Sequence, residues 1–255
     1  MVGMKHERTR ACVTAVAGLL LGLFLSATAE AATFSVNPTQ IALAPRSSSA
    51  LLTLRNESDQ NLRFELSVFA WSQSASGEMK LEPTSDIVFF PALLTLKPQE
   101  ERKVRVGSVT QAAGHEKTYR IFVKELPPVE GAAGGGVRVL TTMGIPIFVR
   151  PEKEVATAAL NELRHTSGQL QFALANTGTV HFIPQQITVR GLADGIQVFE
   201  KQVEGWYVLA GGRRDFGIPV PPEQCAKVTA LRVHVEFASA TLEEDLRTPN
   251  GACTR

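Results

Sequence analysis

The stretch "GGVRVLTTMGIPIFVRP", Gly135–Pro151, decides the fold class of this chain. Small or apolar side chains recur at every second position, which is typical of a β-strand with two different faces. The strand follows a Gly-rich loop, GAAGGG (131–136), and ends at an Arg-Pro pair. Its apolar row either packs on the core of its own domain or remains open for pairing with another chain. The row comprises Val137, Val139, Thr141, Met143 and Ile145.

Short alternating runs with turn residues between them fill the rest of the chain. About seven such strands before residue 150 are typical of an antiparallel sandwich, and the second half repeats the pattern. The charged run RPEKE, which begins at Arg150-Pro151, interrupts the apolar pattern. We therefore predict an all-β protein with one domain over 33–150 and another over 151–255. A short linker stiffened by Pro151 would join them at an angle.

Residues 1–31 have the features of a secretory signal peptide. Basic residues (Lys5, Arg8, Arg10) precede a short apolar run that ends in small residues. A membrane anchor is the alternative. Cleavage after Ala31 would leave 26 − 3 = 23 basic and 25 − 2 = 23 acidic residues, so the mature chain would be neutral. A protein that binds nucleic acid or an anionic membrane would show a basic excess, so we expect a soluble, exported protein.

Two cysteines, Cys225 and Cys253, follow the predicted signal peptide. In an oxidising compartment the simplest expectation is one disulfide, worth about 3–4 kcal/mol in the chain-entropy model for a loop of this length. A free pair or an intermolecular bond is the alternative.

Motifs of catalysis are missing from the sequence. It contains no HExxH or GxSxG pattern, and the histidines are scattered, so structural or surface histidines are expected rather than a metal site. The GAAGGG loop lacks the Lys-Ser/Thr of a phosphate loop. A hydrolase with a dispersed site on a β-scaffold is an open alternative. We nevertheless predict a protein that is not an enzyme, uses no cofactor and acts through an interaction surface.

Several ordered motifs resemble the periplasmic pilus chaperones of the PapD-like family. They are "LKPQEERKVRV" (96–106), "TYRIFVKELPP" (118–128), the Gly-rich loop and "IPIFVRP" (145–151). "FSVNPTQIALAP" (34–45) and "FAWSQ" to "LEPTSDIVFFP" (69–91) are most similar to the archaic, spore-coat-U type branch. The resemblance covers the first predicted domain, whereas the second is supported by position, length and β-pattern.

The resemblance implies two immunoglobulin-like domains joined at an angle. It also implies a function: binding pilus or coat-like subunits by donor-strand complementation and delivering them to an outer-membrane usher, without a nucleotide. The subunit-binding strand would donate the residues called here the donor row, Val137, Val139, Thr141 and Met143. A self-capping dimer through this strand is an open possibility. A secreted structural or adhesive β-sandwich protein is the alternative function.

The sequence departs from the family at the carboxylate anchor. Family members clamp the C-terminal carboxylate of the subunit with two basic residues, and the matching positions here are Gln40 and Pro146. We predict Arg120 and Lys124 as the replacement, because they share one face of a strand that should neighbour the donor strand. A pair of solvated strand charges is the alternative.

The resemblance also places Glu125 and Arg150 at the domain junction, where family members form a salt bridge. Glu236 is the candidate partner from the second domain.

Overall fold

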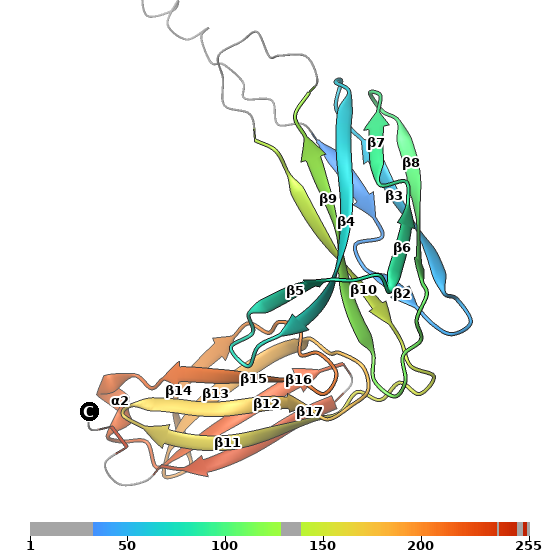
Figure 1. Cartoon of the computed structure of the whole chain (residues 1–255). Helices are drawn as coiled ribbons and strands as arrows, with labels where there is room; N and C mark the ends of the chain where they lie inside the picture. Colours follow the sequence, from blue (N-terminus) through green and yellow to red (C-terminus); the bar gives the residue numbers. More distant parts are fainter. Residues whose placement is uncertain (1–32, 129–138, 239, 249–251, 254–255) are drawn as a thin grey trace, which may run out of the picture.

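The computed structural model describes residues 33–128, 139–238, 240–248 and 252–253. They form two β-sandwich domains joined at an angle, so the molecule is bent like an elbow (Figure 1). This confirms the predicted all-β fold class. No helix in these ranges is long and apolar enough to cross a membrane.

The first domain is a sandwich of two sheets. Its strands are β1 (Phe34–Asn37), β2 (Ile41–Leu43), β3 (Ser49–Asn56), β4 (Leu62–Gln73), β5 (Met79–Pro83), β6 (Ile87–Phe90), β7 (Leu93–Leu96), β8 (Glu101–Ser108), β9 (Lys117–Leu126) and β10 (Thr142–Val149). One sheet has the order β1-β3-β8-β6, and the other has β2-β10-β9-β4-β5 with β7 paired to β4.

The core of the first domain lies between the inner faces of these sheets. Alternate residues of each strand point inward, as the period of two in the sequence predicts. On β9 these are Tyr119, Ile121 and Val123, and on β10 they include Ile145 and Ile147. Phe148 lies on the other face of β10, which points away from this core. It is nevertheless fully buried, because it packs at the junction with the second domain.

The second domain repeats the two-sheet plan. Its elements are β11 (Ala158–Thr166), β12 (Gln169–Asn176), β13 (Pro184–Ala193), β14 (Ile196–Val203), β15 (Arg213–Pro219), the short helix α2 (Pro222–Cys225), β16 (Ala230–Phe237) and β17 (Ala240–Arg247). The sheets have the orders β11-β12-β15 and β14-β13-β16-β17. The predicted disulfide between Cys225 and Cys253 is present in this domain. Arg150-Pro151, the predicted position of the domain boundary, lies in the segment between β10 and β11.

A buried asparagine holds the turn after β12. Asn176 is 3% exposed, and its side-chain amide donates to the carbonyl oxygens of Val180 and Val208, both at 2.9 Å. Its Oδ1 accepts the backbone N–H of Gly178 at 2.9 Å. Asn176 therefore binds three backbone groups of the interior, of which, among the described residues, only the carbonyl oxygen of Val208 has a second donor, the N–H of Phe182.

We expect Asn176→Ala to lower the free energy of unfolding by about 2–4 kcal/mol, because it leaves buried backbone groups unsatisfied. Urea denaturation followed by circular dichroism would measure the change. Asn161→Ala, at an exposed position of β11, is the control and should change stability by less than about 0.5 kcal/mol. Equal effects of the two substitutions would contradict this role of Asn176.

Candidate functional site

The first half of β10 is an open sheet edge. On one side β10 pairs with β9 along its whole length, from Thr142↔Lys124 to Val149↔Lys117. On the other side it pairs with β2 only at Ile147–Val149. Within the described part of the chain, residues 142–146 therefore have a neighbouring strand on one side only.

Backbone hydrogen bonds define which groups point to that edge. The carbonyl oxygen of Thr141 accepts the N–H of Glu125 at 2.9 Å, on the β9 side, whereas the N–H of Arg150 donates to Leu43 at 2.8 Å, on the β2 side. Because backbone groups alternate along a strand, the N–H and C=O of Thr142 and Gly144 point toward the open edge. They can pair with an incoming strand.

The donor row lies at the start of this edge. Val139 is 67% exposed and Thr141 is also exposed, and both precede the first residue of β10. Met143 is half-buried and packs against the core of the first domain. Val137 lies outside the described residues. The strand therefore begins at Thr142, later than the sequence predicts, and only the end of the donor row faces the core.

The anchor positions of the family, Gln40 and Pro146, lie in one row with Arg120, from the residue just before β2 across β10 to β9. Pro146 of β10 pairs with Arg120 of β9, and the parallel pairing Ile147↔Ile41 places Gln40 beside Pro146. All three lie on the face opposite the core residues Ile41, Ile147 and Ile121. We call Gln40, Pro146 and Arg120 the anchor row. Its positive charge is that of Arg120, on β9, the strand next to Pro146.

Arg120 lies against aromatic side chains at the inner bend of the molecule. Its guanidinium carbon is 4.4 Å from the centroid of the Trp71 ring. Burial lowers the pKa of Arg120, and the neighbouring Tyr207 opposes this shift. The Nε of Arg120 and the Nε1 of Trp71 are buried without a hydrogen-bond partner among the described residues. This corner therefore holds a cation against an aromatic ring, with two buried donors that have no partner among the described residues.

Lys124 belongs to the same face but to a different part of it. It is exposed and pairs in register with Thr142 and Glu65. Four residues along a strand separate it from Arg120, about 13 Å between Cα atoms. The structure thus does not place the two predicted anchor residues side by side.

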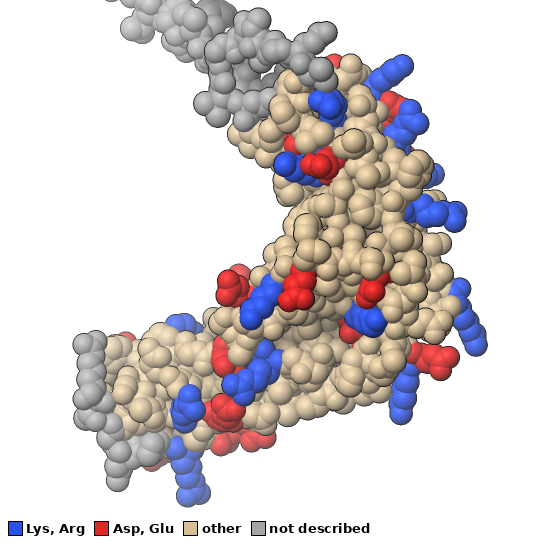
Figure 2. All heavy atoms as spheres, viewed as in Figure 1, with Lys and Arg blue, Asp and Glu red and all other residues tan. Residues whose placement is uncertain are grey.

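Aromatic residues from both domains meet at the junction. Trp71 and Phe148 of the first domain form a buried cluster with Leu209, and Tyr207 packs against it. The ring centroids of Trp71 and Tyr207 are 5.2 Å apart, and Phe148 stacks on His181 at 3.7 Å. Figure 2 shows side chains of both charges on the walls of the hollow between the two domains. The anchor row ends beside this cluster at Arg120.

A buried carboxylate also joins the two domains. Oε2 of Glu116, whose side chain is fully buried, accepts the backbone N–H of His181 at 3.0 Å and lies 2.6 Å from Nδ1 of the same residue. The N–H of Glu116 donates to the carbonyl oxygen of Thr179 at 2.8 Å. These contacts fix the end of β9 to the second domain.

The structure does not bring the predicted junction residues together. Glu125 lies at the other end of β9, where its carboxylate accepts the N–H of Thr141 at 3.2 Å. Arg150 forms its ion pair with Glu154 at 3.1 Å, and Glu236 lies 3.3 Å from His234. β9 begins at the second domain and runs away from it. The junction carboxylate is therefore Glu116, which directly precedes β9, and not Glu125 near its far end.

We expect Glu116→Ala to loosen the junction, because it removes a buried acceptor of two hydrogen bonds. The loss is about 2–4 kcal/mol in the free energy that holds the domains together. Small-angle scattering would record a wider distribution of interdomain angles. The exposed Glu101→Ala is the control, and an unchanged scattering curve for Glu116→Ala would contradict the assignment.

The sequence of the first domain matches a family of known proteins. Residues 33–154 match the model of the pili and flagellar-assembly chaperone PapD N-terminal domain. This chain is a PapD-like pilus chaperone. The family is periplasmic and non-enzymatic, and it serves chaperone–usher pilus assembly. Curated protein sequences give no match to the chaperone.

Solved structures show the same two-domain fold. The chaperone in the chaperone–tip adhesion subunit complex of the archaic Csu pili of Acinetobacter baumannii has 17% identity and a TM-score of 0.60, covering 86% of this chain and 100% of its own. The class 5 fimbriae chaperone CfaA has 12% identity, a TM-score of 0.59 and coverages of 85% and 100%. The E. coli chaperone DraB has 18% identity and a TM-score of 0.54, and the match covers 85% of this chain and 100% of DraB.

The sequence did not indicate the junction residues Trp71, Phe148, His181 and Tyr207. The apolar residues Pro146 and Phe148 on the outward parity of β10 were the available signal, because a strand at the surface of a single domain would have a polar outer face. The partner residues come from strands and loops that are distant in the sequence, and their proximity needs the domain arrangement.

Proposed function

We propose that this chaperone binds a pilus subunit by β-strand pairing at the open edge of β10. The edge of residues 142–146 supports the proposal most directly, because it offers the backbone groups of Thr142 and Gly144 to a partner strand. The donor row would insert its side chains into a groove of the subunit. Each aliphatic side chain buried in this way contributes about 1.5–3 kcal/mol.

We propose further that Arg120 binds the C-terminal carboxylate of the subunit. Its place in the anchor row supports this role, since cross-strand neighbours on one face have Cβ atoms about 5 Å apart. Lys124 lies farther along the same face and would contact the bound strand rather than its end. A charged hydrogen bond in a partly buried site is stronger than one at the surface.

The proposal also covers the kind of protein that the chaperone binds and where it delivers that protein. The archaic Csu chaperone forms a pre-assembly complex with a tip adhesion subunit, which supports a pilus subunit as the partner here. Three further predictions follow from the resemblance to the family: delivery to an outer-membrane usher, membership of the archaic branch and a self-capping dimer. Export directed by residues 1–31 is predicted from the residues of that segment.

Co-expression of the chaperone with the secreted β-rich proteins encoded beside it tests the proposal. Wild type should be recovered with a stoichiometric partner, and Val139→Asp should reduce recovery at least about tenfold, because it places a charge in an apolar groove. Val109→Asp is a matched control, since Val109 is 68% exposed and Val139 is 67% exposed. If wild type is recovered alone, or if Val139→Asp keeps its partner, strand donation through this row is wrong.

A further inference from the structure

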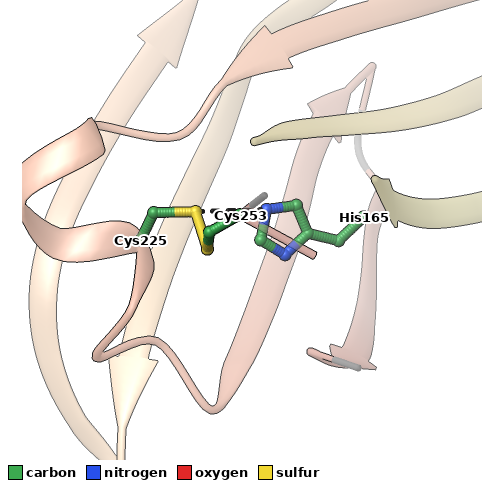
Figure 3. Close-up of a disulfide and its surroundings, with 3 residues drawn as sticks. All are labelled: His165, Cys225 and Cys253. Carbon is green, nitrogen blue, oxygen red and sulfur yellow. Dashed lines mark hydrogen bonds between the residues drawn. A yellow bond between two sulfur atoms is a disulfide. The ribbon is translucent and has the colours of Figure 1, made fainter. Parts of the chain in front are cut away.

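A histidine and the disulfide form a cluster in the second domain. His165 comes from β11, Cys225 from α2 and Cys253 from the C-terminal segment (Figure 3). One potential ligand atom of each residue, the ring nitrogen or Sγ, lies within 4.8 Å of the other two. The cluster is at the end of the second domain that is farthest from the first domain (Figure 1). It is separate from the subunit-binding edge.

The histidine is buried and directed at the sulfur atoms. His165 is 2% exposed, and its Nε2 lies 3.7 Å from Sγ of Cys225. Its Nδ1 is buried and has no hydrogen-bond partner among the described residues. The ring nitrogen that could act as a ligand is Nε2, because it is the one that faces Sγ of Cys225.

The segment that contains Cys253 is also held by its backbone. The carbonyl oxygen of Ala252 accepts the N–H of Gly168 at 2.7 Å, and Ala252 is buried. Gly168 in turn accepts the N–H of Val220 at 3.0 Å. Breaking the disulfide would therefore leave the two sulfur atoms and His165 close together.

We propose that the reduced chaperone binds one thiophilic metal ion, Cu(I), through His165, Cys225 and Cys253. Two thiolates and an imidazole are soft to intermediate ligands, which Cu(I) and Zn(II) prefer. Zn(II) in structural sites takes four protein ligands, and the described residues supply three within reach. A buried three-ligand set therefore favours Cu(I), which is stable with three ligands.

The site forms when the disulfide between Cys225 and Cys253 is reduced. A dithiol reductant attacks the S–S bond, and Cys253 is the more exposed of the two sulfur residues. The reductant is oxidised to a disulfide, and its two electrons and two protons convert Cys225 and Cys253 to thiols. Metal binding then releases these two protons. The oxidised protein has no free thiolate and should not bind the ion.

The test uses the full mature chain, reduced with dithiothreitol and freed of it without oxygen. Cu(I) is titrated against a chromophoric Cu(I) chelator, and Zn(II) is titrated in parallel. We expect one equivalent of Cu(I) bound by the reduced protein and none by the oxidised protein. His165→Leu should weaken binding at least about tenfold, because it removes one ligand. The matched control His234→Leu should leave binding unchanged, since His234 contacts Glu236 and Glu243 instead.

A direct measurement keeps the proposal testable if the His165 variant unfolds. X-ray absorption at the copper edge of the reduced wild type should show two sulfur atoms and one nitrogen. Absence of stoichiometric Cu(I), a shell without nitrogen, or equal affinity in folded His165→Leu would overturn the proposal. Tighter retention of Zn(II) than of Cu(I) would overturn the choice of metal. Subunit capture by the oxidised protein is a separate readout, so the two proposals fail independently.

Discussion

Replacing Arg120 with alanine is expected to weaken capture of a pilus subunit by about 30- to 1000-fold. This equals about 2–4 kcal/mol, the usual effect of removing one partner of a partly buried charge pair. Arg120 lies on the Trp71 ring with its Nε buried and unpaired, so a subunit carboxylate would find a desolvated cation there. Titration calorimetry with a peptide of the subunit's C-terminal strand would measure the loss.

The same peptide with an amidated C-terminus makes the prediction specific. Wild type should bind the free carboxylate more tightly than the amide, whereas Arg120→Ala should bind both equally. Lys124→Ala is the matched control on the same strand face, and its effect should be less than about fivefold because Lys124 is exposed. If Lys124→Ala abolished the preference for the carboxylate and Arg120→Ala did not, the anchor would be Lys124.

Replacing Phe148 with alanine should destabilise the chaperone by about 3–5 kcal/mol, as for other fully buried aromatic side chains. Phe148 is inaccessible to solvent and contacts rings of both domains, since it stacks on His181 at 3.7 Å and lies 6.2 Å from Trp71. Its loss creates a cavity at the junction rather than inside one sandwich. The domains should therefore also become more mobile relative to each other.

Calorimetric unfolding would show this as a lower and broader transition, with the two domains melting less cooperatively. The control is Phe90→Ala, because Phe90 is 78% exposed on β6 and its removal should have little effect. A Phe148→Ala protein that unfolds in one transition at the wild-type temperature would rule out a coupling role for this residue.

The sequence predicted the fold through local patterns. Alternation along the stretch that forms β10 placed Met143 and Ile145 in one row, and both contact the core of the first domain, because the period of two depends only on neighbouring positions. Cys225 and Cys253 were paired correctly, because two cysteines leave one intramolecular partner. The neighbouring positions of β9 and β10, on which the anchor prediction depends, were also predicted correctly.

The junction could not be predicted in this way. Glu125 and Glu116 are both acidic residues at the ends of one strand, and only the direction of β9 relative to the second domain distinguishes them. The contact of Phe148 with His181 likewise depends on how two sandwiches pack. His165 and Cys225 are 60 positions apart in the sequence, and scattered histidines give no sign that one of them lies beside the disulfide.

The anchor row has a consequence for how such proteins are compared. Gln40, just before β2, lies beside Pro146 of β10 and Arg120 of β9, although the three residues are far apart along the chain. With Arg120 as the proposed anchor, a charge on one strand of this row would replace a charge on the next and meet the same ligand atom. A sequence alignment would record this exchange as two unrelated substitutions, one a loss and one a gain. Conservation of function is therefore better judged by the chemistry of each cross-strand row than by identity at single alignment positions.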